Sequence, residues 1–168
     1  IAAIQGGALG GGLQIALGAD IRLVTKDARL SIAEIRWGLV PDMGGCVVLP
    51  GLMREDQIRE LTYTGRDVAG SEAVLLGLAT RIADDPVAEA FTLATRIAGQ
   101  SPSAMRAAKR LRTIAASAAR LTPVTQKGSC DPATVLMAES REQSALMGNA
   151  DQVEAVMAHL EKRAPVFD

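Results

Sequence analysis

The sequence is poor in aromatic residues and in histidine. Its 168 residues include one tryptophan, one tyrosine and two phenylalanines, too few for the platforms on which nucleic-acid-binding proteins stack bases. The net charge of −1 gives no electrostatic attraction to nucleic acid or to an acidic membrane surface. His159 is the only histidine and lies far from any glycine-rich stretch, which disfavours a Ser-His-Asp arrangement or a histidine metal site. We therefore expect neither a metal nor a nucleic-acid partner.

Cysteines and long apolar runs are also scarce. Cys46 and Cys130 are the two cysteines and form no close pair, so we expect no disulfide framework or zinc site and favour a reducing, cytoplasmic compartment. No apolar run reaches the length of a membrane span, and no signal-peptide pattern is present, so no membrane partner is expected. The chain opens with Ile1 inside a strand-like run, which suggests a fragment that lacks an N-terminal part.

Glycine is abundant in one stretch, Gly6 to Gln14, which reads G-G-A-L-G-G-G-L-Q. An apolar strand at residues 1–4 precedes it and a short helix at residues 13–17 follows, so the pattern predicts a strand, a glycine turn and a helix. Its spacing fits neither a dinucleotide fingerprint nor a phosphate loop, and no serine supplies a nucleophile elbow. Two interpretations remain open: a turn that only allows close packing, and backbone donors that stabilise a thioester oxyanion.

The remaining pattern predicts an α/β region followed by helices, with a soft boundary between residues 100 and 120. We expect further strands at 20–25, 29–33 and 78–82, a shaped loop at 34–45, and helices at 46–49, 54–64, 71–76, from 86, from 102 and at 131–147. Residues 122–130 form a polar interruption. Asn149 is expected to cap the last helix, with Gln152 in capping-box spacing.

Two carboxylates stand out as candidates for acid–base chemistry. Glu34 follows an apolar strand and precedes the glycine-rich loop, and Asp42 lies eight residues further along. A carboxyl group in a half-buried, partly apolar site can act as a general acid or base. The alternative for Glu34 is a salt bridge to Arg36 or another arginine, and the alternative for Asp42 is a cap on the next turn.

Several segments together resemble the enoyl-CoA hydratase/isomerase (crotonase) superfamily, from Ile1 to Phe167. The segments that carry the resemblance are I-A-A-I-Q-G-G-A-L-G-G-G, A-D-I-R-L-V-T-K-D-A-R-L-S, E-I-R-W-G-L-V-P-D-M-G-G-C-V-V-L-P, L-T-Y-T-G-R-D-V-A-G-S-E-A-V-L-L-G-L-A-T-R-I and E-K-R-A-P-V-F. The resemblance implies an α/β fold, a superhelix of repeated β-β-α turns with a C-terminal helical region. It assigns residues 1–118 to the C-terminal part of the crotonase core and residues 119–168 to helical trimerisation. Family chains extend beyond this N-terminus.

The resemblance also implies a ligand and the residues that bind it. The ligand is an acyl-CoA thioester, with coenzyme A as part of the substrate and no other cofactor. Gly11 would supply one backbone N–H of the oxyanion hole, and the second donor would come from the region before Ile1. Leu9, Gly10 and Gln14 become candidate substrate-binding residues on the same segment. Lys162 matches a basic position that can approach coenzyme A. The implied assembly is a homotrimer or a hexamer, a dimer of trimers.

Two departures from the family pattern bear on the reaction. Hydratases carry a catalytic glutamate two residues after the triple glycine, where this chain has Gln14, and their other catalytic glutamate matches Glu34. Hydration requires the residue at this position to take up a proton, which the amide of Gln14 cannot do. Asp42 replaces the usual glycine, and the spacing from Glu34 resembles that of dienoyl-CoA isomerases.

We therefore favour double-bond isomerisation of an enoyl- or dienoyl-CoA, with Glu34 and Asp42 as the catalytic acids. The alternatives are 2-enoyl-CoA hydratase chemistry in fatty-acid β-oxidation, with Asp42 or a water bound to Gln14 replacing the missing acid, and a catalytically weak acyl-CoA-binding protein. Trp37 and Met43 are candidates for lining an acyl pocket, although packing in the core is the commoner role of such residues.

Overall fold

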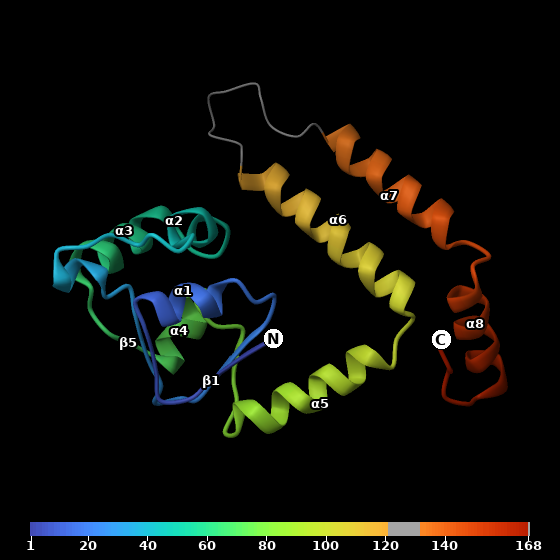
Figure 1. Ribbon diagram of the computed structural model, residues 1–168, viewed down its shortest axis with the longest axis horizontal. Helices are drawn as coiled ribbons and strands as arrows, with labels where there is room; N and C mark the ends of the chain where they lie inside the picture. The colour runs from blue at the N-terminus through green and yellow to red at the C-terminus, as the bar shows by residue number, and fades with distance from the viewer. Residues whose placement is uncertain (121–131, 168) are drawn as a thin grey trace. The chain divides into compact units, whose positions relative to one another are not determined.

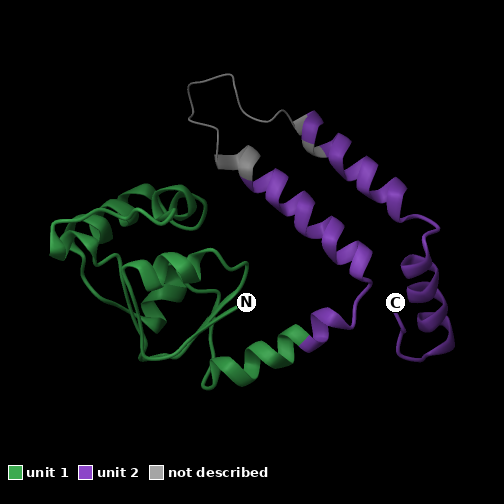
Figure 2. Ribbon diagram, in the orientation of Figure 1, with its two compact units in different colours: residues 1–94 green, residues 95–168 purple. Residues whose placement is uncertain are grey.

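The computed structural model describes residues 1–120 and 132–167 (Figure 1). The chain divides into two compact units, Ile1–Ala94 and Thr95–Asp168, coloured separately in Figure 2. Unit 1 contains the strands and the glycine-rich stretch, and unit 2 is helical. Each unit is described by itself.

The strands of unit 1 are short and belong to two three-stranded sheets. They are β1 (Ala2–Ile4), β2 (Gly7–Leu9), β3 (Arg22–Val24), β4 (Arg29–Ser31), β5 (Val68–Ala69) and β6 (Arg81–Ile82). The first sheet has the order β1-β3-β6 and is parallel throughout. The second has the order β2-β4-β5, in which β2 and β4 are parallel and β5 is antiparallel to β4. Of the consecutive strands β1 and β2, and again of β3 and β4, the first thus belongs to the first sheet and the second to the second sheet. A helix follows each of these two pairs.

Helices follow the strands of unit 1 along the chain. They are α1 (Gly11–Leu17), the 3-10 helix η1 (Glu34–Trp37), α2 (Gly45–Val48), the 3-10 helix η2 (Leu49–Gly51), α3 (Glu55–Thr64), α4 (Gly70–Leu76) and α5 (Pro86–Ala98), whose last turn lies in unit 2. Helix α1 packs on β2, α3 packs on η1, and α4 packs on β5 and β6. Because α1 also contacts α2, the glycine stretch and the segment after Glu34 meet within one unit.

The core of unit 1 is built from aliphatic side chains of both sheets and the helices that cover them. Its buried members are Ile4, Ala8, Leu13, Leu17, Val24, Ala28, Leu30, Ile32, Leu49, Met53, Leu61, Val68, Ala73, Leu78 and Ala79. Arg22 is buried beside this core and donates Nε to the carbonyl of Leu78 and Nη1 to that of Ala19. Burial lowers the pKa of Arg22 from its ordinary value, although the guanidinium stays charged near neutral pH.

Unit 2 consists of the end of α5 and of α6 (Pro102–Arg120), α7 (Pro132–Leu146) and α8 (Ala150–Glu161). Helix α6 packs against α7 and α8, and Arg110 on α6 forms an ion pair with Glu142 on α7 at 2.6 Å. The predicted cap of the last helix is confirmed, because the Asn149 side chain accepts a hydrogen bond from the Gln152 backbone N–H at 2.8 Å.

The sequence predicts most of these elements but not all. The clearest error lies in the glycine stretch, where residues 7–9 form strand β2 instead of continuing a turn. The predicted polar interruption at 122–130, with Cys130, lies outside the described residues. The proposed boundary at 118/119 falls in the last turn of α6, while the two compact units divide at 94/95. The assignment of residues 119–168 to trimerisation stays a prediction. Among the described helices, none is long and apolar enough to cross a membrane.

Candidate functional site

The pairing of β2 with β4 brings the glycine stretch to the end of the strand that precedes Glu34. The two strands are parallel, with Leu9 opposite Ser31, so their carboxyl ends lie at one edge of the sheet. The backbone N–H of Gly10 extends this pairing by donating to the Ser31 carbonyl at 2.9 Å. Edges of this kind are where α/β proteins place functional groups. The register therefore places Gly10, Gly11 and the residues after Ser31 together.

Gly10 has a backbone conformation that only glycine adopts without strain. Its φ is 52° and its ψ is −122°, outside the regions open to residues with a Cβ atom. A Cβ added there would lie 3.4 Å from Oε1 of Glu34. The chain thus turns sharply from β2 into α1 at a point where its backbone passes directly beside the Glu34 carboxylate.

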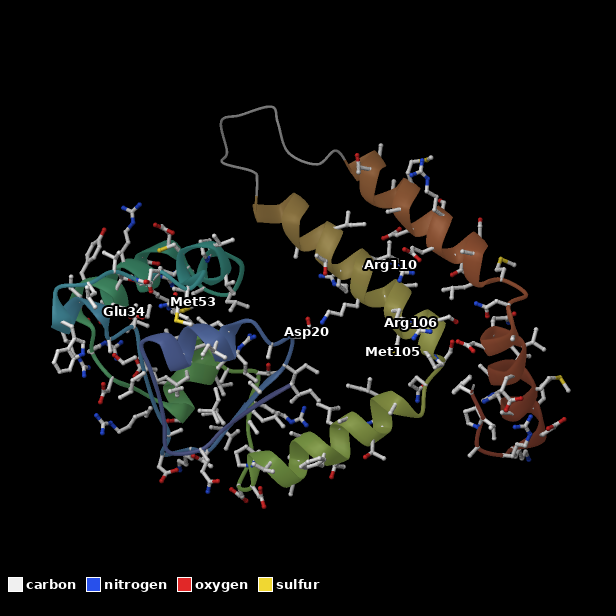
Figure 3. The ribbon with its side chains drawn as sticks, viewed as in Figure 1. Asp20, Glu34, Met53, Met105, Arg106 and Arg110 are labelled. Atoms are coloured by element: carbon white, nitrogen blue, oxygen red, sulfur yellow. The ribbon has the colours of Figure 1, made fainter. Side chains whose placement is uncertain are left out.

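Glu34 begins η1 and is buried, with 8% of its surface exposed. Figure 3 labels it within unit 1. The predicted alternative, a salt bridge to Arg36, is wrong, because the Arg36 guanidinium binds Asp67 at 2.6 Å. Instead Glu34 Oε1 accepts a hydrogen bond of 2.6 Å from Nε2 of Gln14. A buried carboxylate is therefore held by a neutral amide and not by a cation.

Gln14 joins Glu34 to the loop that follows it. Its side chain is also buried, at 7% exposure, on the inward face of α1. Its Oε1 accepts hydrogen bonds from the backbone N–H groups of Met43 and Gly45, both at 2.9 Å. The amide thus uses its oxygen on the backbone of the loop and its nitrogen on the carboxylate.

The second carboxylate oxygen of Glu34 has a different environment. Oε2 is buried and has no hydrogen-bond partner among the described residues. Buried polar atoms in folded proteins are nearly always paired, so an unpaired one indicates either a catalytic role or a partner such as a water molecule or an ion. Here it lies beside Gly10, at the edge of the sheet where the chain leaves β2. Oε2 is thus an atom of this site whose capacity to form hydrogen bonds is unused among the described residues.

Gly11 is the first residue of α1, so its backbone N–H has no acceptor within the helix. None of the hydrogen bonds among the described residues uses this N–H either. A Cβ at Gly11 would lie 2.9 Å from the sulfur of Met43, so the methionine side chain covers this part of the glycine stretch. The assignment of Gly11 to an oxyanion hole stays a prediction.

The other predicted site residues lie on three separate segments of the chain. Leu9 is exposed at the end of β2, and Asp42 is exposed on the loop before Met43. Among the described residues no hydrogen bond joins Asp42 to Glu34. Lys162 belongs to unit 2, where it ends α8 in the left-handed conformation with φ of 54°. The structure thus brings Gly10, Gln14 and Glu34 together.

The segment after Glu34 exposes apolar side chains, contrary to the expectation of core packing for Trp37 and Met43. Trp37 is 79% exposed and Met43 is 53% exposed. Further exposed apolar residues on this segment are Ile35, Leu39, Val40 and Val47. Exposed apolar side chains that gather on one surface can mark a binding site. The carboxylate therefore lies at the start of a segment with apolar side chains suited to an aliphatic ligand.

Sequence reasoning missed the backbone contribution of Met43 and Gly45. Their N–H groups fix the Gln14 amide, yet neither residue type by itself indicates such a role. The glycine pair at 44–45 is the sequence feature that could have indicated this close backbone contact with Gln14. A Cβ at Gly45 would lie 2.9 Å from Gln14 Oε1, so only glycine lets α2 approach the amide this closely.

The protein-family model that describes enoyl-CoA hydratase/isomerase matches residues 1–168. The chain is 33% identical, over 99% of its length, to mitochondrial methylglutaconyl-CoA hydratase 1 of Pyricularia oryzae, and covers 50% of that protein. It is 29% identical, over 97% of its length, to the short-chain-enoyl-CoA hydratase of Clostridium acetobutylicum, and covers 59% of that protein. The chain thus spans about half to three fifths of these relatives.

Solved structures agree with the sequence relatives. The crystal structure of enoyl-CoA hydratase from Mycobacterium tuberculosis superposes with a TM-score of 0.84 and 28% identity, covering 99% of this chain and 62% of that one. The predicted fold class, the crotonase-like α/β fold, is confirmed by this likeness and by the strand order of unit 1. The family match over every residue and the shared fold lead to one conclusion: the chain belongs to the enoyl-CoA hydratase/isomerase family.

Proposed function

We propose that the protein processes acyl-CoA thioesters and isomerises the double bond of an enoyl- or dienoyl-CoA. One observation carries the choice of reaction: Glu34 has one oxygen bound by an amide and one buried oxygen without a partner. A shift of a double bond along a chain needs one base that removes a proton from carbon and returns it elsewhere. A single carboxylate with a single free oxygen suits this requirement.

The mechanism follows from the positions of Glu34 and Gly11. Oε2 of Glu34 takes a proton from the carbon of the substrate next to the unsaturated bond. The electrons of that C–H bond are delocalised through the acyl group onto the thioester oxygen. The resulting enolate oxygen accepts a hydrogen bond from the Gly11 N–H, with the second donor coming from outside the described residues. The enolate then collapses, and Glu34 returns the proton to a different carbon. Such an oxyanion donor is typically worth about 3 to 4 kcal/mol of barrier.

Hydration of the double bond is the second candidate, and the names of the relatives favour it. It requires one group to activate water and another to deliver a proton to carbon. The hydratases' second acid corresponds to Gln14, whose amide accepts no proton and whose polar atoms are already engaged by Glu34, Met43 and Gly45. Asp42 would have to supply that acid, and it is exposed. The third candidate is an acyl-CoA-binding protein with weak turnover.

The remaining predicted contacts complete the proposal. The apolar segment with Trp37 would contact the acyl chain, together with Leu9 at the end of β2. Gly10 would let the thioester approach Glu34, and Lys162 would contact coenzyme A. Asp42 would assist proton return in dienoyl substrates. A cytoplasmic homotrimer or hexamer, without a cofactor beyond substrate coenzyme A, is the assembly that we propose.

Assays on three substrates test the reaction. The whole protein is incubated with crotonyl-CoA, a 3-enoyl-CoA and a 3,5-dienoyl-CoA, and each product is identified by chromatography. We expect isomerised products from the second or third substrate and loss of turnover by at least about 100-fold in Glu34→Gln, since general acid–base groups contribute about 10² to 10⁴. The exposed Glu55→Gln, on α3, is the matched control.

Other outcomes assign the other functions. Hydration of crotonyl-CoA that requires both Glu34 and Asp42, tested with Asp42→Asn, would establish the hydratase and refute isomerisation as the main activity. Tight binding of acyl-CoA without turnover of any of the three substrates would establish a binding protein. Full isomerase activity in Glu34→Gln would refute the assignment of the base.

A further inference from the structure

The hydrogen bonds of Gln14 fix the direction in which its amide points. Its oxygen accepts from the backbone N–H groups of Met43 and Gly45 at 2.9 Å each. A backbone N–H can only donate, so an amide turned the other way would direct its NH₂ group at two donors. The NH₂ group must therefore face Glu34, where Nε2 lies 2.6 Å from Oε1.

This direction determines what each oxygen of Glu34 can do. An amide nitrogen donates and does not accept, so Oε1 of Glu34 must be the acceptor and cannot carry a proton in this direction. The hydrogen bond from Nε2 therefore favours Oε2, the buried oxygen without a partner among the described residues, as the site of a proton taken up by Glu34. The hydrogen bonds are thus donated in one direction: the backbone N–H groups of residues 43 and 45 donate to Gln14, and Gln14 donates to Glu34.

We propose that Gln14 is a positioning residue that makes Oε2, and not Oε1, the oxygen of Glu34 that exchanges a proton with the substrate. The proposal rests on the proposed function, in which Glu34 is the base. It gives Gln14 a role through Glu34 in place of the direct substrate contact that the sequence predicts. The same bonds tie the carboxylate to the Met43–Gly45 segment, so that the base and this loop are held as one unit.

The charged groups on the elements around the Gln14–Glu34 pair form ion pairs with one another or are exposed. Helices α1 and α2 contain no charged residue. Arg36 on η1 binds Asp67, as does Arg29 on β4, and Asp42 on the loop is exposed. Helix α3, which packs on η1, carries Glu55, Asp56, Arg59 and Glu60, and these pair with one another or with Arg54 and Arg66. Gln14 is thus the polar side chain that is hydrogen-bonded to Glu34.

Replacing Gln14 by glutamate is the sharpest test, because it preserves shape and removes the donor. In Gln14→Glu the oxygen that faces Met43 and Gly45 is kept, while a second oxygen replaces Nε2 at 2.6 Å from Glu34. Two carboxylates so close cannot both be ionised, so the pair holds one proton that it releases at higher pH. Gln14→Met removes the donor without adding a charge. Gln57→Glu, on α3 of the same unit, is the matched control.

The readout is the titration of the Glu34 carboxyl carbon, followed by nuclear magnetic resonance in the whole protein with ¹³C-labelled glutamate. The Glu34 signal is identified by its loss in Glu34→Gln. We expect the titration midpoint to rise by about one pH unit or more in Gln14→Glu, to rise by less in Gln14→Met, and to stay unchanged in Gln57→Glu. The acid limb of the kcat/KM profile should move with it.

The outcomes separate this proposal from the proposed function. A Glu34 midpoint unchanged in both Gln14→Glu and Gln14→Met would overturn the positioning role, whatever the enzyme catalyses. If Gln14→Glu does not fold, the midpoint in Gln14→Met decides alone, because that variant introduces no charge. Shifted midpoints in a protein that isomerises none of the three substrates would uphold the role of Gln14 and refute the isomerase. A purely structural role would lower stability without moving the midpoint.

Discussion

The three consecutive glycines at positions 10 to 12 should respond differently to alanine, because their backbone conformations and surroundings differ. Gly10 has φ of 52° and ψ of −122°, and its added Cβ would lie 3.4 Å from Glu34. Gly11 would place its Cβ against the sulfur at the flexible end of the Met43 side chain, at 2.9 Å. Gly12 has no atom within 4 Å of an added Cβ and lies inside α1.

Because of these differences, the alanine substitutions should change the free energy of unfolding in opposite directions. In Gly10→Ala the backbone would be held in a region that costs about 1 to 3 kcal/mol for a residue with a Cβ. In Gly12→Ala the helix gains up to about 1 kcal/mol, because alanine loses less conformational freedom than glycine. Gly11→Ala should lie between the two, since Met43 can rotate away. The gap between Gly10→Ala and Gly12→Ala should therefore reach about 2 kcal/mol or more.

Urea denaturation and thermal unfolding of the three variants measure this gap. For a chain of this length, 2 kcal/mol corresponds to a difference in Tm of roughly 4 to 8 °C. Equal stability of Gly10→Ala and Gly12→Ala would show that the turn between β2 and α1 does not have the described conformation. A larger loss in Gly12→Ala than in Gly10→Ala would refute the assignment of the first helical residues.

Two further predictions concern packing in unit 1 and the tail of unit 2. Gly70→Ala should lower the free energy of unfolding by about 1 to 3 kcal/mol or more in urea titrations, because its Cβ would lie 2.0 Å from the Thr25 carbonyl oxygen; equal stability would contradict this close approach. Hydrogen bonds, first from Arg163 and then from the Val166 backbone, lower the pKa of Glu154 to about 2, so their stabilising contribution is complete above about pH 4.5 and is lost as the pH falls towards 2. Glu154→Gln should therefore speed tryptic cleavage after Arg163 at neutral pH, whereas the exposed Glu139→Gln should not.

The sequence predicts elements where the pattern is local. Helix α1 and strand β4 follow apolar periodicity, and Asn149 with Gln152 marks the start of α8. Strand β2 is missed because glycine and alanine have low strand propensity. Its strand conformation comes from parallel pairing with β4, more than 20 residues away, which no local pattern reveals.

The residue types of the site are also predictable, but their connections are not. Glu34 and Gln14 stand out by chemistry and by resemblance, whereas the hydrogen bond between them joins positions 20 residues apart. The same limit explains the error for Trp37. Its apolar surface favours burial on average, and only its position at the end of η1 in the folded chain shows that it is exposed.

The unpaired oxygen of Glu34 should cost stability, and this cost can be measured. Burying a charged group without full hydrogen bonding is unfavourable, and Oε2 of Glu34 is buried without a partner. In Glu34→Gln the charge disappears, while an amide oxygen can still accept the hydrogen bond from Nε2 of Gln14. We therefore expect Glu34→Gln to unfold with a free energy equal to or about 1 kcal/mol above that of the wild type at pH 7, while turnover is lost.

Urea denaturation of both proteins at pH 7 gives this comparison, with Glu55→Gln as the control for loss of an exposed carboxylate. A clear loss of stability in Glu34→Gln would mean that Oε2 makes a favourable contact in the folded protein, and it could not then be the free oxygen of a base. A gain in stability together with a loss of activity would support the proposal that the unpaired oxygen is unfavourable for folding and is the atom that the proposed reaction needs.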